Sequence, residues 1–369
     1  MRVSCITLRQ FRNYSEQKVP FEHNINIFTG NNAQGKTNLL EAIYFSAMGK
    51  SHRTTSDDEL INWHHTEATI EVFFTRHQVD HHLLIRLERS GGKQIILNDH
   101  VIKPKDLLGN LNIVLFSPED LSFVKGSPVL RRKFLDGEIS QTSRIYYQEL
   151  LQYNRIVQQR NHLLKKIKEL RAKTDQLDPW DEQLAVAAAS LVKRRREALR
   201  KMAMLANLMH RKLSNSNETL TTVYHQPYFR EGDDELYHTL DPSWYKQKIA
   251  SARPVDLART ITTVGPHRDD LILSVNGTSL RTYGSQGQQR TGALAYKLAE
   301  LEYIKSETGE YPVLLLDDVM SELDSIRREQ LTAFVKDRIQ TFITATDQQF
   351  FQQVKTAAIY TIAEGKVIR

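Results

Sequence analysis

Eight consecutive residues near the N-terminus have the types and spacing of a phosphate-binding loop. Four residues separate Gly30 from Gly35, and Lys36 and Thr37 follow directly. The apolar run Ile25–Thr29 precedes the loop, and an amphipathic segment follows it. Glycines let backbone N–H groups turn inward around a phosphate, and a helix N-terminus adds partial positive charge. This strand–loop–helix arrangement therefore predicts a nucleoside triphosphate site.

The loop's side chains suggest how ATP and Mg²⁺ would be held. The Lys36 ammonium would reach the β- and γ-phosphates, and the Thr37 hydroxyl would be a magnesium ligand. The backbone of the loop would surround the phosphates. The predicted nucleotide contacts are Gly30, Asn31, Asn32, Ala33, Gln34, Gly35, Lys36, Thr37 and Asn38.

A second site element is a pair of acids after a buried strand. Four apolar residues, 313–316, precede Asp317 and Asp318. In an open α/β sheet, ligands bind outside the carboxyl ends of the strands, which is where these acids emerge. We predict that Asp317 holds Mg²⁺, mainly through water, and that Asp318 polarises the attacking water. Lys36, Asp317 and Asp318 are the catalytic candidates of this part of the chain.

The surrounding patterns indicate how these residues are positioned. Residues 2–8, 68–74, 82–88 and 94–97 alternate like strands of an antiparallel sheet, whereas 313–316 and 341–345 are apolar throughout or nearly so, as in buried parallel strands. From about residue 140 the period becomes helical, with Pro179 expected to separate two long helices of an αα-hairpin. Residues 214–241 are polar and expected to be irregular, and Asn276-Gly277 predicts a β-hairpin turn. We therefore expect a discontinuous nucleotide-binding domain, 1–116 with 262–369, and an inserted helical lobe, 117–261.

Composition limits the classes of protein. With 40% hydrophobic and 25% charged residues the chain resembles an ordinary globular protein, and no apolar run is long enough to cross a bilayer. Its single cysteine, Cys5, excludes an internal disulfide, which fits a reducing cytoplasm. The net charge of +6 favours a polyanionic partner, although charge alone is also compatible with a solvated basic surface.

The order of the motifs resembles the ABC-type ATPases, and within them the chromosome-maintenance branch that contains SMC proteins, Rad50 and RecF. The stretch YGSQGQQR, residues 283–290, looks like that group's signature motif. The resemblance implies that Ser285 and Gly287 contact the γ-phosphate held by a second subunit, which adds Ser285 to the catalytic candidates. It also makes residues 321–324 a D-loop and implies an ABC-type head with a mixed sheet, an antiparallel β subdomain and the inserted lobe.

Two departures from the ABC pattern point to slow hydrolysis. Asp318 stands where the group usually has glutamate, so its carboxylate is set back by one methylene. The switch position holds Thr346 or Asp347 instead of histidine. Both changes weaken the positioning of the attacking water. Residues 116–121 fall where a Q-loop would lie but contain no glutamine, so we assign no metal ligand there.

Five further segments spread along the chain are typical of one family: ITLRQFRNY (6–14), GKSHR (49–53), FSPEDL (116–121), RRKFLD (131–136) and GPHRDD (265–270). Through them the resemblance is closest to the RecF family and covers essentially the whole chain. It implies a cytoplasmic, weakly DNA-stimulated ATPase in recombination and repair. ATP would close a homodimer on DNA at gaps or ds/ss junctions without sequence specificity, and the protein would act with RecR, and possibly RecO, to load the recombinase on single-stranded DNA.

DNA binding itself rests on charge and resemblance. Basic residues cluster at 131–133, 165–168 and 193–201, and such side chains position DNA by its phosphates. A solvated helix face is an equally good explanation of the last cluster, and residues 267–270 are best explained as a structural, salt-bridged turn.

Two other functions remain possible from the sequence. A transporter-type ATPase subunit is disfavoured because Lys36 and Ser285 lie 249 positions apart and the switch histidine is missing. An ATP-switched scaffold without hydrolysis is poorly distinguished from a slow ATPase.

Overall fold

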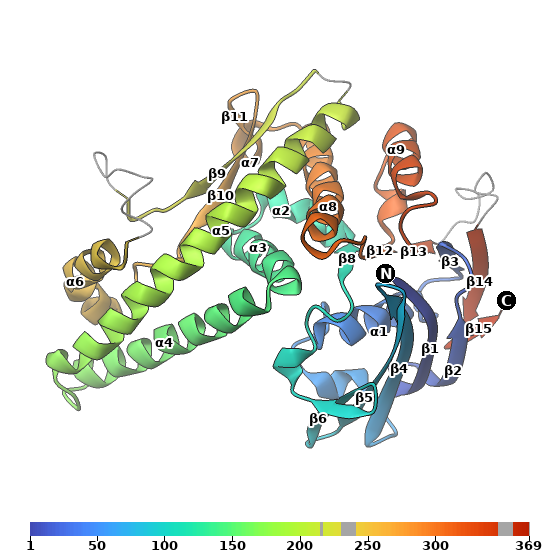
Figure 1. The fold of residues 1–369 in the computed structure, drawn as a ribbon, viewed down its shortest axis with the longest axis horizontal. Coiled ribbons are helices and arrows are strands. Elements are labelled where there is room, and N and C mark those ends of the chain that lie inside the picture. The colour runs from blue at the N-terminus through green and yellow to red at the C-terminus, as the bar shows by residue number, and fades with distance from the viewer. Residues whose placement is uncertain (215–216, 230–240, 346–356, 369) are drawn as a thin grey trace. The chain divides into compact units, whose positions relative to one another are not determined.

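The chain folds into two compact units, Met1–Ser122 with Lys297–Arg369 and Phe123–Tyr296. This computed structural model describes residues 1–214, 217–229, 241–345 and 357–368 (Figure 1). Residues 262–296, which the sequence analysis placed with the nucleotide-binding segments, lie in the second unit, because their strand pairs with a strand of that unit.

The first unit contains a mainly parallel sheet in the order β15-β14-β3-β13-β12-β8. Strands β3, β13, β12, β8 and β14 run parallel, and among the described strands of this sheet only β15 is antiparallel to its neighbour. The prediction that 313–316 and 341–345 form buried parallel strands is confirmed, and the structure pairs them with each other. The strands are β3 (Ile25–Thr29), β8 (Ile113–Phe116), β12 (Val313–Asp317), β13 (Thr341–Ala345), β14 (Ala357–Ala363) and β15 (Lys366–Ile368).

A second sheet of the same unit is antiparallel throughout, in the order β2-β1-β4-β5-β6-β7. Its inward residues alternate with exposed polar ones, the pattern from which the sequence predicted it. Its strands are β1 (Arg2–Phe11), β2 (Tyr14–Pro20), β4 (Glu67–Arg76), β5 (Val79–Glu88), β6 (Gly92–Leu97) and β7 (His100–Ile102).

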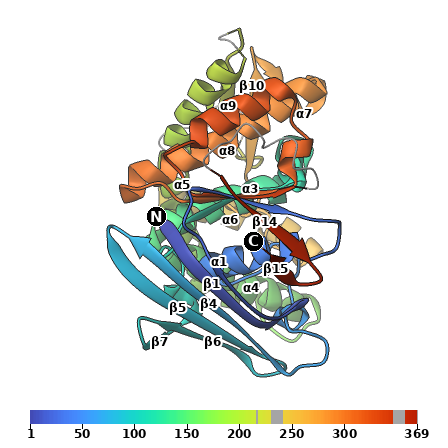
Figure 2. The same ribbon diagram turned by 90° about the vertical axis from the view of Figure 1, so that its right-hand side faces the viewer.

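Helix α1 (Lys36–Met48) lies between these two sheets (Figures 1 and 2). Its apolar side chains join residues of both sheets in one buried core, in which Phe21, Phe28 and Phe342 pack ring against ring. Because α1 is held on both faces, the loop at its N-terminus has a fixed position. The unit also contains α9 (Ser325–Val335) and the 3₁₀ turns η1 (Asp57–Leu60), η2 (Pro104–Asp106), η3 (Pro118–Leu121) and η6 (Val319–Ser321).

The second unit is built on a pair of long helices, α4 (Arg144–Lys168) and α5 (Asp178–Leu213), that pack side by side (Figure 1). The predicted αα-hairpin is confirmed. Pro179 does not stand between the two helices, because it occupies the first turn of α5, where its missing N–H is not needed. The other helical elements are α2 (Ser122–Lys125), α3 (Pro128–Thr142), η4 (Thr174–Leu177), α6 (Pro242–Arg259), α7 (Leu280–Tyr283) and α8 (Gln286–Thr308), which continues into the first unit.

A small antiparallel sheet completes the second unit, in the order β11-β10-β9. The predicted hairpin at Asn276-Gly277 joins β10 (Asp270–Val275) to β11 (Thr278–Ser279). The expectation of irregular structure over residues 214–241 was wrong for residues 220–225, and residues 215–216 and 230–240 of that range lie outside the described residues. The segment contains β9 (Leu220–His225), which pairs with β10 along its full length.

No helix in the described part of the chain is both long and apolar enough to span a bilayer.

Candidate nucleotide-binding site

The phosphate-binding loop connects β3 to α1 and requires glycine at both ends. Gly30 has a φ of +141°, and a Cβ there would come within 2.2 Å of the Ile362 carbonyl oxygen. Gly35 has a φ of +118° and is the N-cap of α1, with no side chain capping the first turn. The N–H groups of that turn therefore remain directed to the loop, which suits an anion.

The two C-terminal strands and the β1–β2 turn fix the outer side of the loop through Gln34. The Gly365 N–H donates to the Gln34 carbonyl oxygen at 3.0 Å, and the Glu364 N–H donates to the Gln34 Oε1 at 2.6 Å. The Asn13 amide donates to the same Gln34 carbonyl oxygen at 2.9 Å. The Gln34 side chain is therefore an anchor, which leaves its backbone N–H for the predicted nucleotide contact.

Lys36 lies across the mouth of the loop. Its Nζ donates to the carbonyl oxygens of Gly30 at 2.5 Å and Asn31 at 2.9 Å. Burial lowers the pKa of this ammonium, while the nearby Asp318 and Asp317 carboxylates raise it. A cation in this position can exchange carbonyl partners for phosphate oxygens without moving far.

The predicted magnesium ligands meet at one point. The Thr37 Oγ1 donates to the Asp317 Oδ1 at 3.0 Å, and the Thr344 Oγ1 donates to the same oxygen at 2.8 Å. Within the described residues no cluster of three His, Cys, Asp or Glu side chains forms a metal cage. A hydroxyl and one carboxylate beside a phosphate loop fit Mg²⁺, which keeps several waters and takes its remaining ligands from phosphates.

Asp318 is held in a strained conformation beside this point. Its φ of +54° lies in the left-handed region, and its N–H donates to the Thr344 Oγ1 at 2.9 Å. Burial and the neighbouring Asp317 raise the pKa of the Asp318 carboxyl, whereas Lys36 lowers it. Such strain persists only where surrounding contacts fix it, and it is concentrated at functional sites.

Thr344 is a functional candidate that the sequence analysis did not assign. Its hydroxyl bonds to both Asp317 and the backbone of Asp318, so it aligns the acidic pair. The available indication was a polar residue near the C-terminal end of a buried strand next to the acidic one. The switch position, Thr346 or Asp347, lies outside the described residues.

A buried carboxylate of α1, Glu41, belongs to a network of side chains beside the loop and was also missed. It is fully buried, and Arg12 donates to both of its oxygens, at 2.8 and 3.0 Å. Burial alone would raise the pKa of Glu41, but the bonds from Arg12 and Ser51 hold it below the ordinary value. The Asn38 side chain donates to Asn13 and accepts from Arg53, which also donates to Glu41. Asn38, a predicted nucleotide contact, thus ties the loop helix to this cluster.

The signature segment belongs to the second unit. Ser285 is exposed, directly before α8, and the Gln289 side chain donates to the carbonyl oxygens of Leu280 and Gly284, at 2.9 and 3.0 Å. A Cβ at Gly284 would come within 2.6 Å of the Leu280 oxygen. The turn is therefore rigid and presents Ser285 to solvent, while the loop residues and both acids lie in the first unit.

The structure removes two arginines from the set of DNA-contact candidates. Arg131 is buried and makes a two-pronged ion pair with Asp270, at 2.7 and 2.9 Å. Arg195 is buried between Asp136 and the Pro266 carbonyl oxygen. Consecutive helix residues point around the axis, so a basic run cannot present every side chain to one ligand. The exposed members of the basic clusters include Lys165, Lys166, Lys193, Arg200 and Lys201.

The segment GPHRDD is structural, as its explanation as a salt-bridged turn predicted. Asp270 pairs with Arg131, and His267 bonds to the Tyr153 hydroxyl and the Thr262 carbonyl oxygen. Burial lowers the pKa of His267 to about 4, so the ring is neutral near pH 7.

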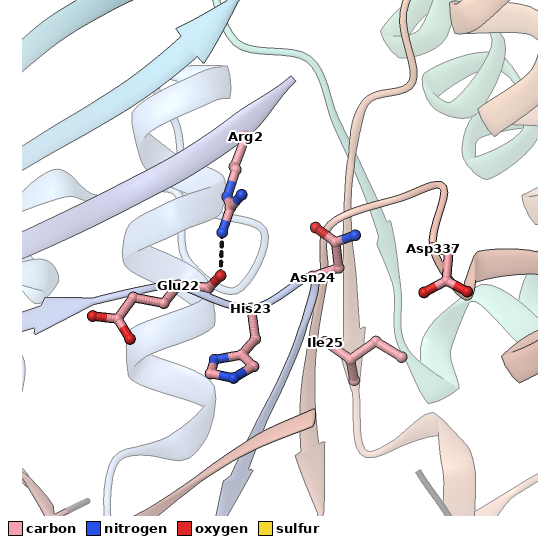
Figure 3. A pocket seen from close by; sticks show the side chains of 6 residues that line it. All are labelled: Arg2, Glu22, His23, Asn24, Ile25 and Asp337. Atoms are coloured by element: carbon pink, nitrogen blue, oxygen red, sulfur yellow. Dashed lines mark hydrogen bonds between the residues drawn. The ribbon is translucent and has the colours of Figure 1, made fainter. Parts of the chain in front are cut away.

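A pocket in the first unit lies at the opposite end of β3 from the phosphate loop (Figure 3). Ile25, the first residue of β3, lines it together with His23 and Asp337. The arginine that lines it, Arg2, donates a hydrogen bond to the Glu22 carbonyl oxygen. We assign no ligand to this pocket.

Comparison with known proteins agrees with the fold and shows the family. The profile of the RecF/RecN/SMC N-terminal domain matches residues 2–369. The chain is 46% identical to the DNA replication and repair protein RecF of Alkaliphilus oremlandii, and 42% identical to the protein of that name from Bacillus pumilus, over the full length of each. The structure matches the recombination mediator protein RecF-ATP of the RecFOR pathway with a TM-score of 0.91 and 37% identity, covering 99% of this chain and 96% of the other.

A more distant match shows the wider class. An Smc head bound to the C-terminal winged-helix domain of ScpA matches with a TM-score of 0.58 at 16% identity, covering 100% of this chain and 97% of the other, which shows a shared fold. The protein is thus an SMC-head-like P-loop protein by fold. At the identities given above, the chain belongs to the RecF family.

Proposed function

We propose that this chain is a DNA repair and recombination ATPase that uses ATP and Mg²⁺ to close a homodimer on DNA. The observation that carries the proposal is the meeting of Thr37, Asp317 and Thr344 beside the glycine-fixed loop. The family supports it as well, because relatives are named DNA replication and repair proteins and one solved relative is described with ATP.

In this proposal the first unit binds the triphosphate. The first-turn N–H groups of α1 and the Lys36 ammonium bind the β- and γ-phosphates, and Lys36 releases the Gly30 and Asn31 carbonyl oxygens to do so. Thr37 and Asp317 would hold Mg²⁺, which neutralises developing phosphate charge when bound. Thr344 keeps the Asp317 carboxylate aimed at the Thr37 hydroxyl.

Asp318 is the proposed group that orients the attacking water. Its raised pKa makes it a better proton acceptor than an ordinary aspartate. Its side chain is one methylene shorter than glutamate, so the water is held less well and we expect slow turnover. An ATP-switched scaffold without hydrolysis is the second candidate, and the same short side chain favours it.

The dimer in this proposal places Ser285 and Gly287 of one copy on the γ-phosphate bound by the other copy. ATP then favours the dimer because it binds the closed pair better than the single chain. The exposed lysines and arginines of α4 and α5 would contact DNA phosphates without reading sequence. From membership of the RecF family we infer that the DNA bound is at gaps or ds/ss junctions. We infer from the same membership that RecR, and possibly RecO, are partners in loading the recombinase.

Single-turnover hydrolysis with and without duplex DNA tests the enzymatic part of the proposal. We expect slow hydrolysis by the natural protein, none by Asp318→Asn, and a rate at least as high for Asp318→Glu, whose carboxylate reaches further. Hydrolysis by Asp318→Asn at the natural rate would remove Asp318 from the mechanism. Complete absence of hydrolysis in the natural protein with bound ATP would leave the scaffold as the better function.

A salt titration of DNA affinity tests the nucleic-acid part. Because each phosphate contact releases a counterion, we expect affinity to fall steeply with salt and to depend little on sequence. A salt-independent or strongly sequence-dependent affinity would contradict phosphate-dominated binding.

A further inference from the structure

The backbone N–H and the hydroxyl oxygen of Ser285 make hydrogen bonds within the second unit. The Ser285 N–H donates to the Gln288 Oε1 at 3.0 Å, and the Gln288 N–H donates to the Ser285 Oγ at 3.2 Å. This reciprocal arrangement is a capping box at the N-terminus of α8. It occupies the serine N–H, a donor that a γ-phosphate could otherwise accept from, while the hydroxyl accepts from Gln288 and keeps its own O–H as a donor.

A carboxylate holds the capping glutamine in the orientation that this box needs. The Gln288 Nε2 donates to the Glu218 Oε1 at 2.8 Å. An ionised carboxylate only accepts hydrogen bonds, so the NH₂ group of Gln288 must face Glu218 and its oxygen must face the Ser285 N–H. Rotating the amide would bring two acceptors together at Glu218 and two donors together at Ser285. Glu218 thereby locks the glutamine in its capping orientation.

The backbone next to Glu218 is held in position by hydrogen bonds. The neighbours of Glu218 in the chain are tied to two elements: the Thr219 N–H donates to the Asn276 side chain at 2.9 Å, and the Leu220 N–H donates to the Asn207 side chain of α5 at 3.0 Å. Its second carboxylate oxygen lies 3.7 Å from the Nε2 of the buried His210. The lock is therefore anchored both to the β10–β11 hairpin and to the C-terminal end of α5.

We propose that Gln288 and Glu218 form a latch that withholds the Ser285 N–H from the phosphate of a second copy, and that Glu218 is a positioning residue that sets how much ATP is needed to close the dimer. The inference rests on the proposed role of Ser285. In the closed dimer the Gln288 side chain turns away, and the Ser285 N–H and hydroxyl face the phosphate. The free energy needed to break the Gln288–Glu218 hydrogen bond therefore contributes to the free energy of closing the dimer.

The variant that tests the latch is Glu218→Gln. Its amide can present either an oxygen or an NH₂ group to Gln288, so the glutamine is no longer locked. A charge-assisted hydrogen bond is a strong one, and its loss should lower the ATP concentration for half-maximal dimerisation by about fivefold to tenfold. ATP binding by single chains at low protein concentration should stay unchanged, because Glu218 lies outside the phosphate loop. Glu182→Gln, an exposed α5 carboxylate that pairs with Lys246, is the matched control.

A second measurement keeps the latch testable if no ATP-dependent dimer forms. Amide hydrogen exchange of Ser285 reports the capping bond in the single chain, and Glu218→Gln should accelerate it about tenfold, whereas Glu182→Gln should not. Faster exchange without any dimer in the natural protein would show that Glu218 locks Gln288, but it would reject the proposed dimer and with it the latch's role in closure. Unchanged exchange, or a dimerisation midpoint that is unchanged or higher in Glu218→Gln, would overturn the latch.

Discussion

Replacing the buried Asp269 with asparagine should change how the stability of the protein depends on pH. Asp269 is fully buried, and the Tyr224 hydroxyl donates to its Oδ2 at 2.6 Å. Burial raises the pKa of Asp269 from 3.8 to about 6, although Tyr224, Tyr228, Arg195 and Arg132 favour the charged form. Asparagine has the same shape, can accept the same bond from Tyr224, and never ionises.

The size and sign of the effect follow from these two pKa values. A pKa of about 6 in the folded chain and 3.8 in the unfolded chain mean that ionisation of Asp269 costs the fold roughly 3 kcal/mol. Because the folded-state pKa is raised, this group's contribution is fully present below the unfolded value and is lost as the pH rises through about 6. Between about pH 4.5 and about pH 7.5 the loss should be about 2 kcal/mol.

Urea unfolding of the natural chain and of Asp269→Asn at several pH values measures this loss. The unfolding free energy of the natural chain minus that of the variant removes titration common to both. This difference should fall by about 2 kcal/mol as the pH rises over that range. Tyr224→Phe removes a bond that stabilises the carboxylate, so it should destabilise the chain more at high pH than at low pH. A difference that stays flat, or rises with pH, would refute the reasoning.

Two further predictions concern the loop and the basic helix. Gly30→Ala should lose ATP binding and roughly 1–3 kcal/mol of stability or more, because its Cβ would meet a backbone oxygen at a positive φ. The control Ala33→Gly, also at a positive φ, should shift stability by less than about 1 kcal/mol. Thermal unfolding and nucleotide titration measure both variants, and a stable Gly30→Ala that still binds ATP would contradict the loop geometry. Arg195→Leu should lower the unfolding free energy by about 3–5 kcal/mol, because it leaves Asp136 without its buried partner. Arg200→Ala should leave stability unchanged and reduce the slope of log affinity against log salt for DNA binding by about 1. The reverse pattern would show that the buried and exposed faces of α5 were misassigned.

The phosphate loop and the parallel strands were predictable because their patterns are local. Each of these patterns lies within about ten residues of the chain. They are the G-x-x-x-x-G-K-T spacing, the apolar strand before it and the two acids after residues 313–316. The hairpin at Asn276-Gly277 was predictable for the same reason, since the turn residues specify its conformation.

Features that depend on distant partners were not predictable. Strand β9 has strand-favouring residues, Thr221 to Tyr224, but it lies within a polar stretch, and its partner β10 is more than 40 positions further along the chain. The burial of Arg195 depends on Asp136, 59 positions away, so a run of basic letters looked like a surface. Thr344 acquires its role from Asp317, 27 positions away, and Glu41 from Arg12, 29 positions away.

The most direct test of the central claim is whether one copy's phosphate loop and another copy's signature turn share an ATP. Light scattering should show an ATP-dependent dimer of the natural chain and single chains for both Lys36→Arg and Ser285→Arg. A mixture of the two variants should regain part of the dimer, because one site of the mixed pair combines an intact Lys36 with an intact Ser285. If the mixture stays as monomeric as each variant alone while the natural chain dimerises, or if the natural chain never responds to ATP, the shared site does not exist.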